Sequence, residues 1–139
     1  MLAAIPLLVL PVGAYAALAL ILTGGFFALD APERLSRPLL VLSTAGGGSW
    51  PVSSADLLLG VAIVISFLEL LKGVADRRAA IVNHALSIIL FIACLAAMLV
   101  APVFATSTFF LLTLMVLLDL IAGFVITMGQ RGGGAAPRA

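Results

Sequence analysis

The chain has 139 residues, of which 64% are hydrophobic and 9% are charged, and its net charge is +1. Soluble domains carry roughly 25% charged residues, so this composition excludes an ordinary water-soluble protein and indicates that lipid surrounds the chain. The small net charge lacks the basic surface that binds nucleic acid, and we expect no such partner. A helix needs about 20 apolar residues to cross a bilayer, so the length allows about four spans and no separate soluble domain.

The first predicted span covers residues 3–29 and contains no charged side chain. It has no basic residue at its start, is too long for the apolar region of a signal peptide and contains two prolines, so we interpret it as a membrane helix. Pro6 fits the first turn, whereas Pro11 is expected to bend the helix. Gly13 and Ala17 have the spacing of small residues that allows another helix to approach closely.

Residues 30–54 are predicted to lie outside the membrane. Asp30 precedes a glutamate by three positions, a capping-box spacing in which Asp30 would accept a hydrogen bond from an early backbone N–H. We predict that residues 31–42 form a short amphipathic helix on the membrane surface. Arg34 and Arg37 on this helix would reach lipid headgroups and act as interfacial anchors.

Two alternatives remain for the same region. One is a β-hairpin in which residues 39–44 return through Gly46–Gly48 to residues 50–53. The other is a simple ordered loop. Trp50 is typical of an interfacial anchor under each interpretation, because its ring has an apolar body and a polar N–H.

The remaining predicted spans cover residues 55–74, 78–101 and 108–128. Short connections between these spans force antiparallel neighbours. The predicted fold class is therefore an all-α membrane protein, a single four-helix antiparallel bundle formed by residues 1–128. Residues 129–139 are rich in glycine and alanine and are predicted to be a flexible tail. The expected helix caps are Ser53 or Ser54 for the second span and Thr106 or Ser107 for the fourth.

Basic residues favour one orientation of these spans. Arg34 and Arg37 lie on one side of the predicted bundle, and five basic residues lie on the other. Because cytoplasmic loops carry the excess of Lys and Arg, we expect a bacterial inner-membrane protein with both termini in the cytoplasm. The five residues on the cytoplasmic side are Lys72, Arg77, Arg78, Arg131 and Arg138.

A few polar side chains fall inside the predicted spans, where ionisable groups are costly and are candidates for function. Helical spacing indicates that they meet in one polar cluster in the cytoplasmic half of the bundle. An ion pair between Glu69 and Lys72 is the simplest interpretation of those two residues. The whole set is Glu69, Lys72, Asn83, His84, Ser87 and Asp119.

Asp119 gives the sharpest signal, because it lies near the middle of its span among leucine and isoleucine. It must point inward, be protonated or meet a partner, and the candidate partners are Lys72 or His84 of this chain or a group on another subunit. The cluster therefore serves either as contacts between helices or as a path for protons or ions.

The sequence contains one cysteine and one histidine and no recognisable cofactor motif. Cys94 is expected to be a small buried hydrophobe, and one histidine supplies only one metal ligand. We therefore expect no metal, no cofactor and no enzymatic activity.

Two functions follow from these patterns. The first is an accessory or structural subunit of a larger membrane complex, with other membrane subunits and lipid as partners. The alternative is a small homo-oligomeric transporter or channel for protons or cations that uses Asp119 and Glu69. In length and helix count the chain is similar to the small multidrug-resistance transporters, but these depend on a glutamate in the first span, where this chain has no charge.

The segments NHALSIILFIACL, residues 83–95, and ATSTFFLLTLMVLLDLIAGF, residues 105–124, carry a second resemblance. They are similar to small uncharacterised bacterial four-helix inner-membrane proteins. The resemblance covers about half of the chain, from Phe67 to Met128. It implies a fold of four membrane helices and no particular activity.

Overall fold

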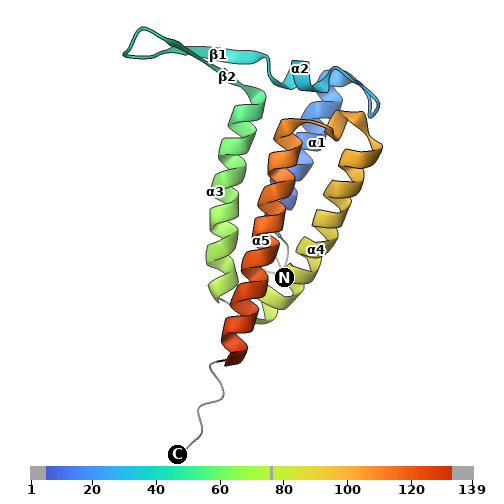
Figure 1. Ribbon diagram of the computed structural model, residues 1–139, viewed down its shortest axis with the longest axis vertical. Helices are drawn as coiled ribbons and strands as arrows, with labels where there is room; N and C mark the ends of the chain where they lie inside the picture. The colour runs from blue at the N-terminus through green and yellow to red at the C-terminus, as the bar shows by residue number, and fades with distance from the viewer. Residues whose placement is uncertain (1–5, 76, 133–139) are drawn as a thin grey trace, which may run out of the picture.

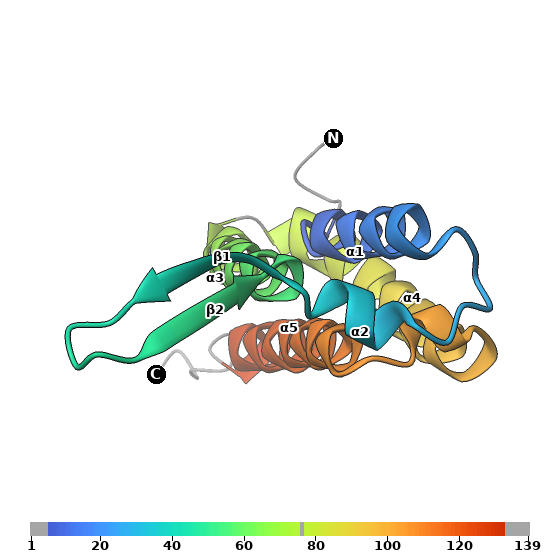
Figure 2. The same cartoon turned by 90° about the horizontal axis from the view of Figure 1, so that it is seen from above.

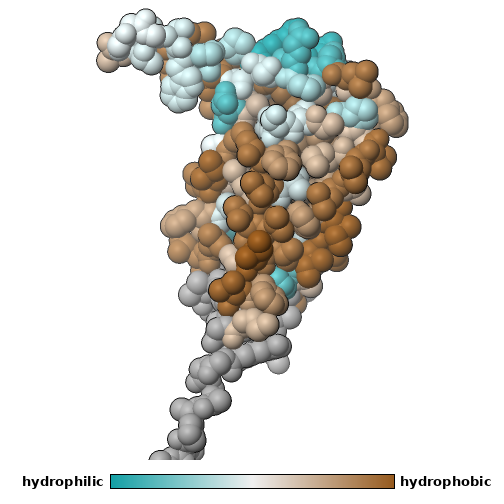
Figure 3. Space-filling view, in the orientation of Figure 1, coloured by the Kyte–Doolittle hydropathy of each residue, from teal (hydrophilic) through white to brown (hydrophobic). Residues whose placement is uncertain are grey.

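Three long apolar helices form the body of the protein in a computed structural model that describes residues 6–75 and 77–132. They run side by side in alternating directions (Figure 1), because only short connections join them. Each contains an apolar segment long enough to cross a membrane, and apolar side chains cover most of the helical face that Figure 3 shows. These are the features of a membrane protein. The helices are α3 (Ser54–Ala75), α4 (Arg77–Val100) and α5 (Ser107–Gly132).

A shorter apolar helix, α1 (Val9–Thr23), packs against α3 and α5. Its 15 residues span about 22 Å, less than the roughly 30 Å of a bilayer core. The predicted span 3–29 is therefore longer than the helix in the described part of the chain. α1 ends where Gly24 adopts a left-handed φ of 76° and donates its N–H to the carbonyl of Leu20 at 2.8 Å. Pro11 lies in the first turn, so its missing N–H removes no helical hydrogen bond.

The segment between α1 and α3 contains a very short helix, α2 (Ala31–Leu35), and two antiparallel strands, β1 (Pro38–Ser43) and β2 (Ser49–Ser53). The strands form a hairpin that extends sideways beyond the outline of the bundle (Figure 2). The prediction of a surface helix over residues 31–42 is therefore wrong beyond Leu35, and the hairpin alternative is confirmed. Pro38 disfavours a helical conformation at the residue before it, and Gly47, with a φ of 80°, allows the chain to reverse.

Side-chain caps fix the starts of two long helices. Ser53 and Asp56 form a reciprocal cap at α3, because Ser53 Oγ accepts from the Asp56 N–H at 3.2 Å and Asp56 Oδ2 accepts from the Ser53 N–H at 2.9 Å. Thr106 Oγ1 accepts from the Phe109 N–H at 3.1 Å and caps α5. The predicted caps of both helices are thus confirmed. At its other end, α5 continues past the predicted end of the span at Met128 to Gly132.

An aromatic cluster closes the hairpin end of the bundle. The ring of Tyr15, on α1, lies 5.0 Å from that of Phe109 and 6.1 Å from that of Phe104, measured between centroids. Phe104 belongs to the 3-10 helix η2 (Pro102–Phe104), which joins α4 to α5. The Tyr15 hydroxyl donates to the Val103 carbonyl at 3.1 Å and also bonds Thr106 Oγ1. Tyr15 is fully buried, so it ties α1 to the loop between two membrane helices.

Candidate intramembrane polar site

Glu69 joins α3 to the start of α1. It lies on α3 and is 1% exposed. Its Oε2 accepts a hydrogen bond from the backbone N–H of Leu8 at 3.1 Å. The first N–H groups of a helix have no partner within the helix and carry a partial positive charge, so a carboxylate is a favourable acceptor for them. Glu69 thus provides a hydrogen-bond acceptor for a backbone N–H at the beginning of α1, which starts among apolar side chains.

Ser87 and Asp119 join α4 to α5. The Ser87 hydroxyl donates to Asp119 Oδ2 at 3.0 Å, and the two residues are 1% and 7% exposed. Asp119 therefore points inward and meets a partner, two of the alternatives that its position among leucines left open. Interhelical hydrogen bonds of this kind help membrane helices to associate, because apolar side chains gain little by leaving lipid for each other.

His84 lies one helical turn from Ser87 along the same contact between α4 and α5. Its ring stacks near Phe124, with 6.4 Å between centroids. A Cβ atom at Gly123 would lie 3.0 Å from His84 Nδ1, so a larger residue there would require the His84 ring to move by a few tenths of an ångström. His84 Nδ1 and Asn83 Oδ1 are buried, and neither has a hydrogen-bond partner among the residues that the structure describes.

The predicted cluster is thus seen as two groups of contacts. The first joins Glu69 to the start of α1, and the second places Ser87, Asp119 and His84 along α4 and α5. The side chain of Lys72 lies outside the described residues, so the predicted ion pair with Glu69 is not addressed. Within the described chain, no three His, Cys, Asp or Glu side chains form a group that could hold a metal ion.

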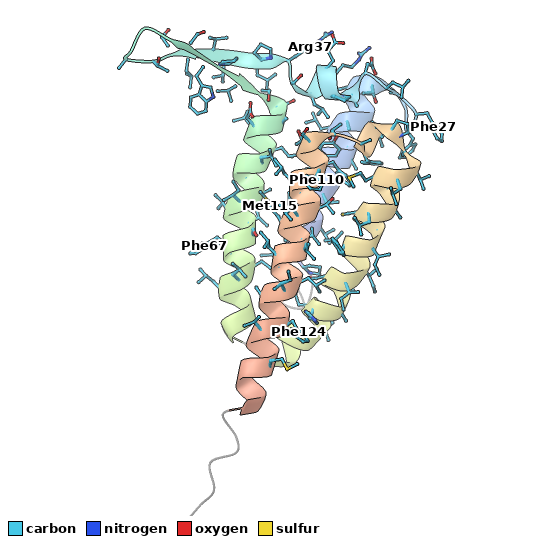
Figure 4. The ribbon with its side chains drawn as sticks, viewed as in Figure 1. Phe27, Arg37, Phe67, Phe110, Met115 and Phe124 are labelled. Carbon is cyan, nitrogen blue, oxygen red and sulfur yellow. The ribbon has the colours of Figure 1, made fainter. Side chains whose placement is uncertain are left out.

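The predicted interfacial anchors lie at the hairpin end of the molecule. Arg34 Nη1 donates to the Leu22 carbonyl in the last turn of α1 at 3.0 Å, so Arg34 also caps that helix. Its Nε bonds the Asp30 carboxylate, and this hydrogen bond holds the pKa of Asp30 below its ordinary value. Asp30 was predicted to cap a backbone N–H, but it makes no such bond to α2. Arg37 lies at the same end (Figure 4), and Trp50 is 57% exposed.

Two neighbouring hollows lie between α1 and α4, and no sequence pattern predicted either of them. One has a volume of about 370 Å³ and extends from Pro6 and Val9 to Leu90 and Ala93. The other has a volume of about 180 Å³, shares those last two residues and contains Cys94. Both are lined by apolar side chains, so they offer a shaped apolar surface and no polar chemistry. We call the two together the α1–α4 groove.

Comparisons with protein-family models, with curated proteins and with solved structures found no match to this chain.

Proposed function

We propose that the protein is an accessory or structural subunit of a larger membrane protein complex in a bacterial inner membrane. The observation that carries this proposal is the use of the two intramembrane acids. Glu69 accepts from the backbone of α1, and Asp119 accepts from Ser87 on a neighbouring helix. Both carboxylates thus make contacts that hold helices together, which is how polar groups act in a structural membrane protein.

Small exposed residues on the outer surface of α1 support the proposal that a partner helix binds there in the membrane. Gly13 and Ala17 are exposed on this helix, and the space around Gly13 is open. Small residues at this spacing let the backbone of a second helix come close. The α1–α4 groove lies beside them. We therefore assign α1 and this groove to a transmembrane helix of a partner subunit.

The proposed orientation places both termini of the four-span chain in the cytoplasm and the hairpin on the opposite side. The imbalance of basic residues supports it, with five against two. Under this orientation, α1 is the core of the first span, and the end of the bundle that carries the hairpin faces away from the cytoplasm.

Purification from native membranes in a gentle detergent tests the proposal. We expect fixed membrane partners in stoichiometric amounts with the wild-type chain and their loss with Gly13→Leu. Gly60→Leu is the matched control, because Gly60 is also an exposed helical glycine with open space around it, on α3. Recovery of the chain alone, or equal losses in the two variants, would contradict a partner helix at α1.

A small homo-oligomeric transporter or channel for protons or cations is the second candidate. Buried polar atoms on α4 favour it, since His84 Nδ1 and Asn83 Oδ1 have no hydrogen-bond partner within the described residues. A histidine ring can take part in proton exchange, and an amide oxygen can coordinate a cation. Purified protein in liposomes should then conduct or exchange ions, and Asp119→Asn should abolish the flux. Unchanged flux in this variant would remove Asp119 from such a mechanism.

A further inference from the structure

The hairpin of β1 and β2 is apolar, yet little of it is covered by the rest of the protein. No charged residue occurs from Pro38 to Ser53. Every residue of β1 is exposed, and three of the five residues of β2 are exposed as well. Figures 1 and 2 show that the hairpin leaves the end of α3 sideways and projects beyond the bundle. An apolar hairpin with two open edges is unfavourable in bulk water, so a surrounding surface must cover part of it.

The two faces of the hairpin differ in polarity. Strand pairing places Leu40 opposite Val52 and Leu42 opposite Trp50. Since side chains alternate along a strand, these four large apolar residues share one face. The other face, by the same pairing, carries Val41 and Pro51 together with two serines, Ser43 and Ser49. The sheet is therefore amphipathic, with one wholly apolar face, which we call the Trp50 face.

The base of the hairpin is covered on both faces. Val52, on the Trp50 face, is 6% exposed, and Ser53, which follows it on the opposite face, is 7% exposed. Ser54, the first residue of α3, is also the first residue of a candidate membrane span. The hairpin leaves the end of this span sideways (Figure 1), so one of its faces overlies the lipid that surrounds α3. The wholly apolar Trp50 face is the one that lipid favours.

The dimensions of the hairpin favour lipid over a second protein. Six residues at about 3.3 Å each and two strands about 4.8 Å apart give a face of roughly 20 Å by 10 Å, or about 200 Å². A stable protein interface buries about 800 Å² on each partner. The face is too small to hold a protein partner alone. A bilayer surface requires no minimum area, and it is where tryptophan is enriched.

We propose that the Trp50 face lies on the bilayer at the boundary between lipid headgroups and acyl chains. Leu40, Leu42 and Trp50 enter the apolar side of this boundary, and the face with Ser43 and Ser49 meets headgroups and water. Because the hairpin carries no charge, this position costs no charge desolvation. The hairpin fixes the depth and rotation of α3, which follows it directly in the sequence.

Trp50 is the only tryptophan in the chain and therefore reports on this position alone. The full chain is reconstituted in phosphatidylcholine vesicles that contain lipid brominated either near the headgroup or deep in the acyl chain. We expect the shallow bromines to quench Trp50 fluorescence more than the deep ones, and aqueous acrylamide to quench it weakly. Strong acrylamide quenching without bromine quenching would overturn the proposal. Weak quenching by both would overturn it too, because it would place Trp50 against protein.

Two aspartate substitutions test which face is involved. Leu42→Asp puts a charge on the Trp50 face, and we expect the bromine quenching to be lost and the emission to shift to the red. Ser43→Asp puts the same charge on the next residue, which points to the opposite face, and should leave both readings as in wild type. Equal effects of the two substitutions, or the reverse order, would refute the assignment of the Trp50 face. Helical circular dichroism of both variants verifies that the bundle is intact.

Discussion

The contact between Glu69 and the start of α1 gives a prediction whose size follows from the structure. Glu69→Met replaces the carboxylate with an apolar side chain of similar length. The Leu8 N–H then loses the oxygen that accepts from it at 3.1 Å, at a residue that is 1% exposed. A buried donor left without an acceptor costs about 1–3 kcal/mol, and water does not replace the acceptor in an apolar environment. We expect the unfolding equilibrium constant to rise roughly 5- to 150-fold.

Equilibrium unfolding of purified protein in mixed detergent micelles, followed by helical circular dichroism, measures this change. Glu69→Gln keeps an oxygen that can accept from Leu8 and should cost clearly less than Glu69→Met. Leu70→Met, at the exposed neighbouring position, controls for the presence of a methionine at this depth. If Glu69→Met were as stable as Leu70→Met, or Glu69→Gln as unstable as Glu69→Met, the Leu8 hydrogen bond would not account for the role of Glu69.

Two further predictions concern the hairpin end of the bundle. Tyr15→Phe keeps the packed ring but removes the hydroxyl that donates to the Val103 carbonyl, and should cost about 1–2 kcal/mol in the same unfolding measurement. Arg34→Gln removes the principal cause of the lowered pKa of Asp30, so a carbon-13 titration should show this pKa rising toward its ordinary value. A lowered pKa stabilises the folded state above the unfolded pKa, and this stabilisation is lost as the pH falls through the folded pKa. The acid-dependent loss of stability should therefore be smaller in Arg34→Gln.

Composition and apolar runs predicted the three long helices, because lipid imposes a minimum length of apolar sequence on a spanning helix. The start of α5 at the Thr106 cap was also predictable, since a cap depends on residues that are close in the sequence. The end of α1 was not predicted. Gly24 and Gly25 lie inside a continuous apolar run. Hydropathy alone does not predict that Gly24 adopts the left-handed conformation that ends the helix.

The conformation of the segment before α3 was assigned to the wrong alternative. Leu35, Leu39 and Leu42 have the spacing of an amphipathic helix, but Leu39 and Leu42 also fit a strand that pairs across a glycine turn. Helical periodicity over so short a segment is weak, and pairing with residues 49–53 decides the conformation. The pairing is not local, so the sequence leaves both alternatives open.

The partners of the intramembrane acids were only partly predictable. The sequence showed that Asp119 must point inward, be protonated or meet a partner, because its neighbours leave it no polar contact in its own helix. Its hydrogen bond with Ser87 depends on the rotation of two helices about their axes, and this rotation could not be predicted from the sequence. The hydrogen bond from Leu8 to Glu69 is harder still to predict, because its donor is a backbone N–H, and every residue except proline has one.

The Ser87–Asp119 contact provides the test that best separates the two proposed functions. Ser87→Ala and Asp119→Leu each leave one buried polar group without this partner. The double variant replaces both groups with apolar side chains, which can be nearly neutral. We therefore expect the double variant to be more stable than the sum of the two single effects by about 0.5–2 kcal/mol, within the range measured for interhelical hydrogen bonds in membranes.

The same double variant has a different consequence under each function. If the carboxylate only joins α4 to α5, the double variant should recover membrane partners in the same amounts as wild type, because the helices still pack. If Asp119 carries protons or cations, the double variant should be stable but unable to exchange them in liposomes. Additive stability effects would show that the hydrogen bond contributes nothing to the fold. The contact between Asp119 and Ser87 would then not stabilise the fold, and this result would favour the transport proposal over the subunit proposal.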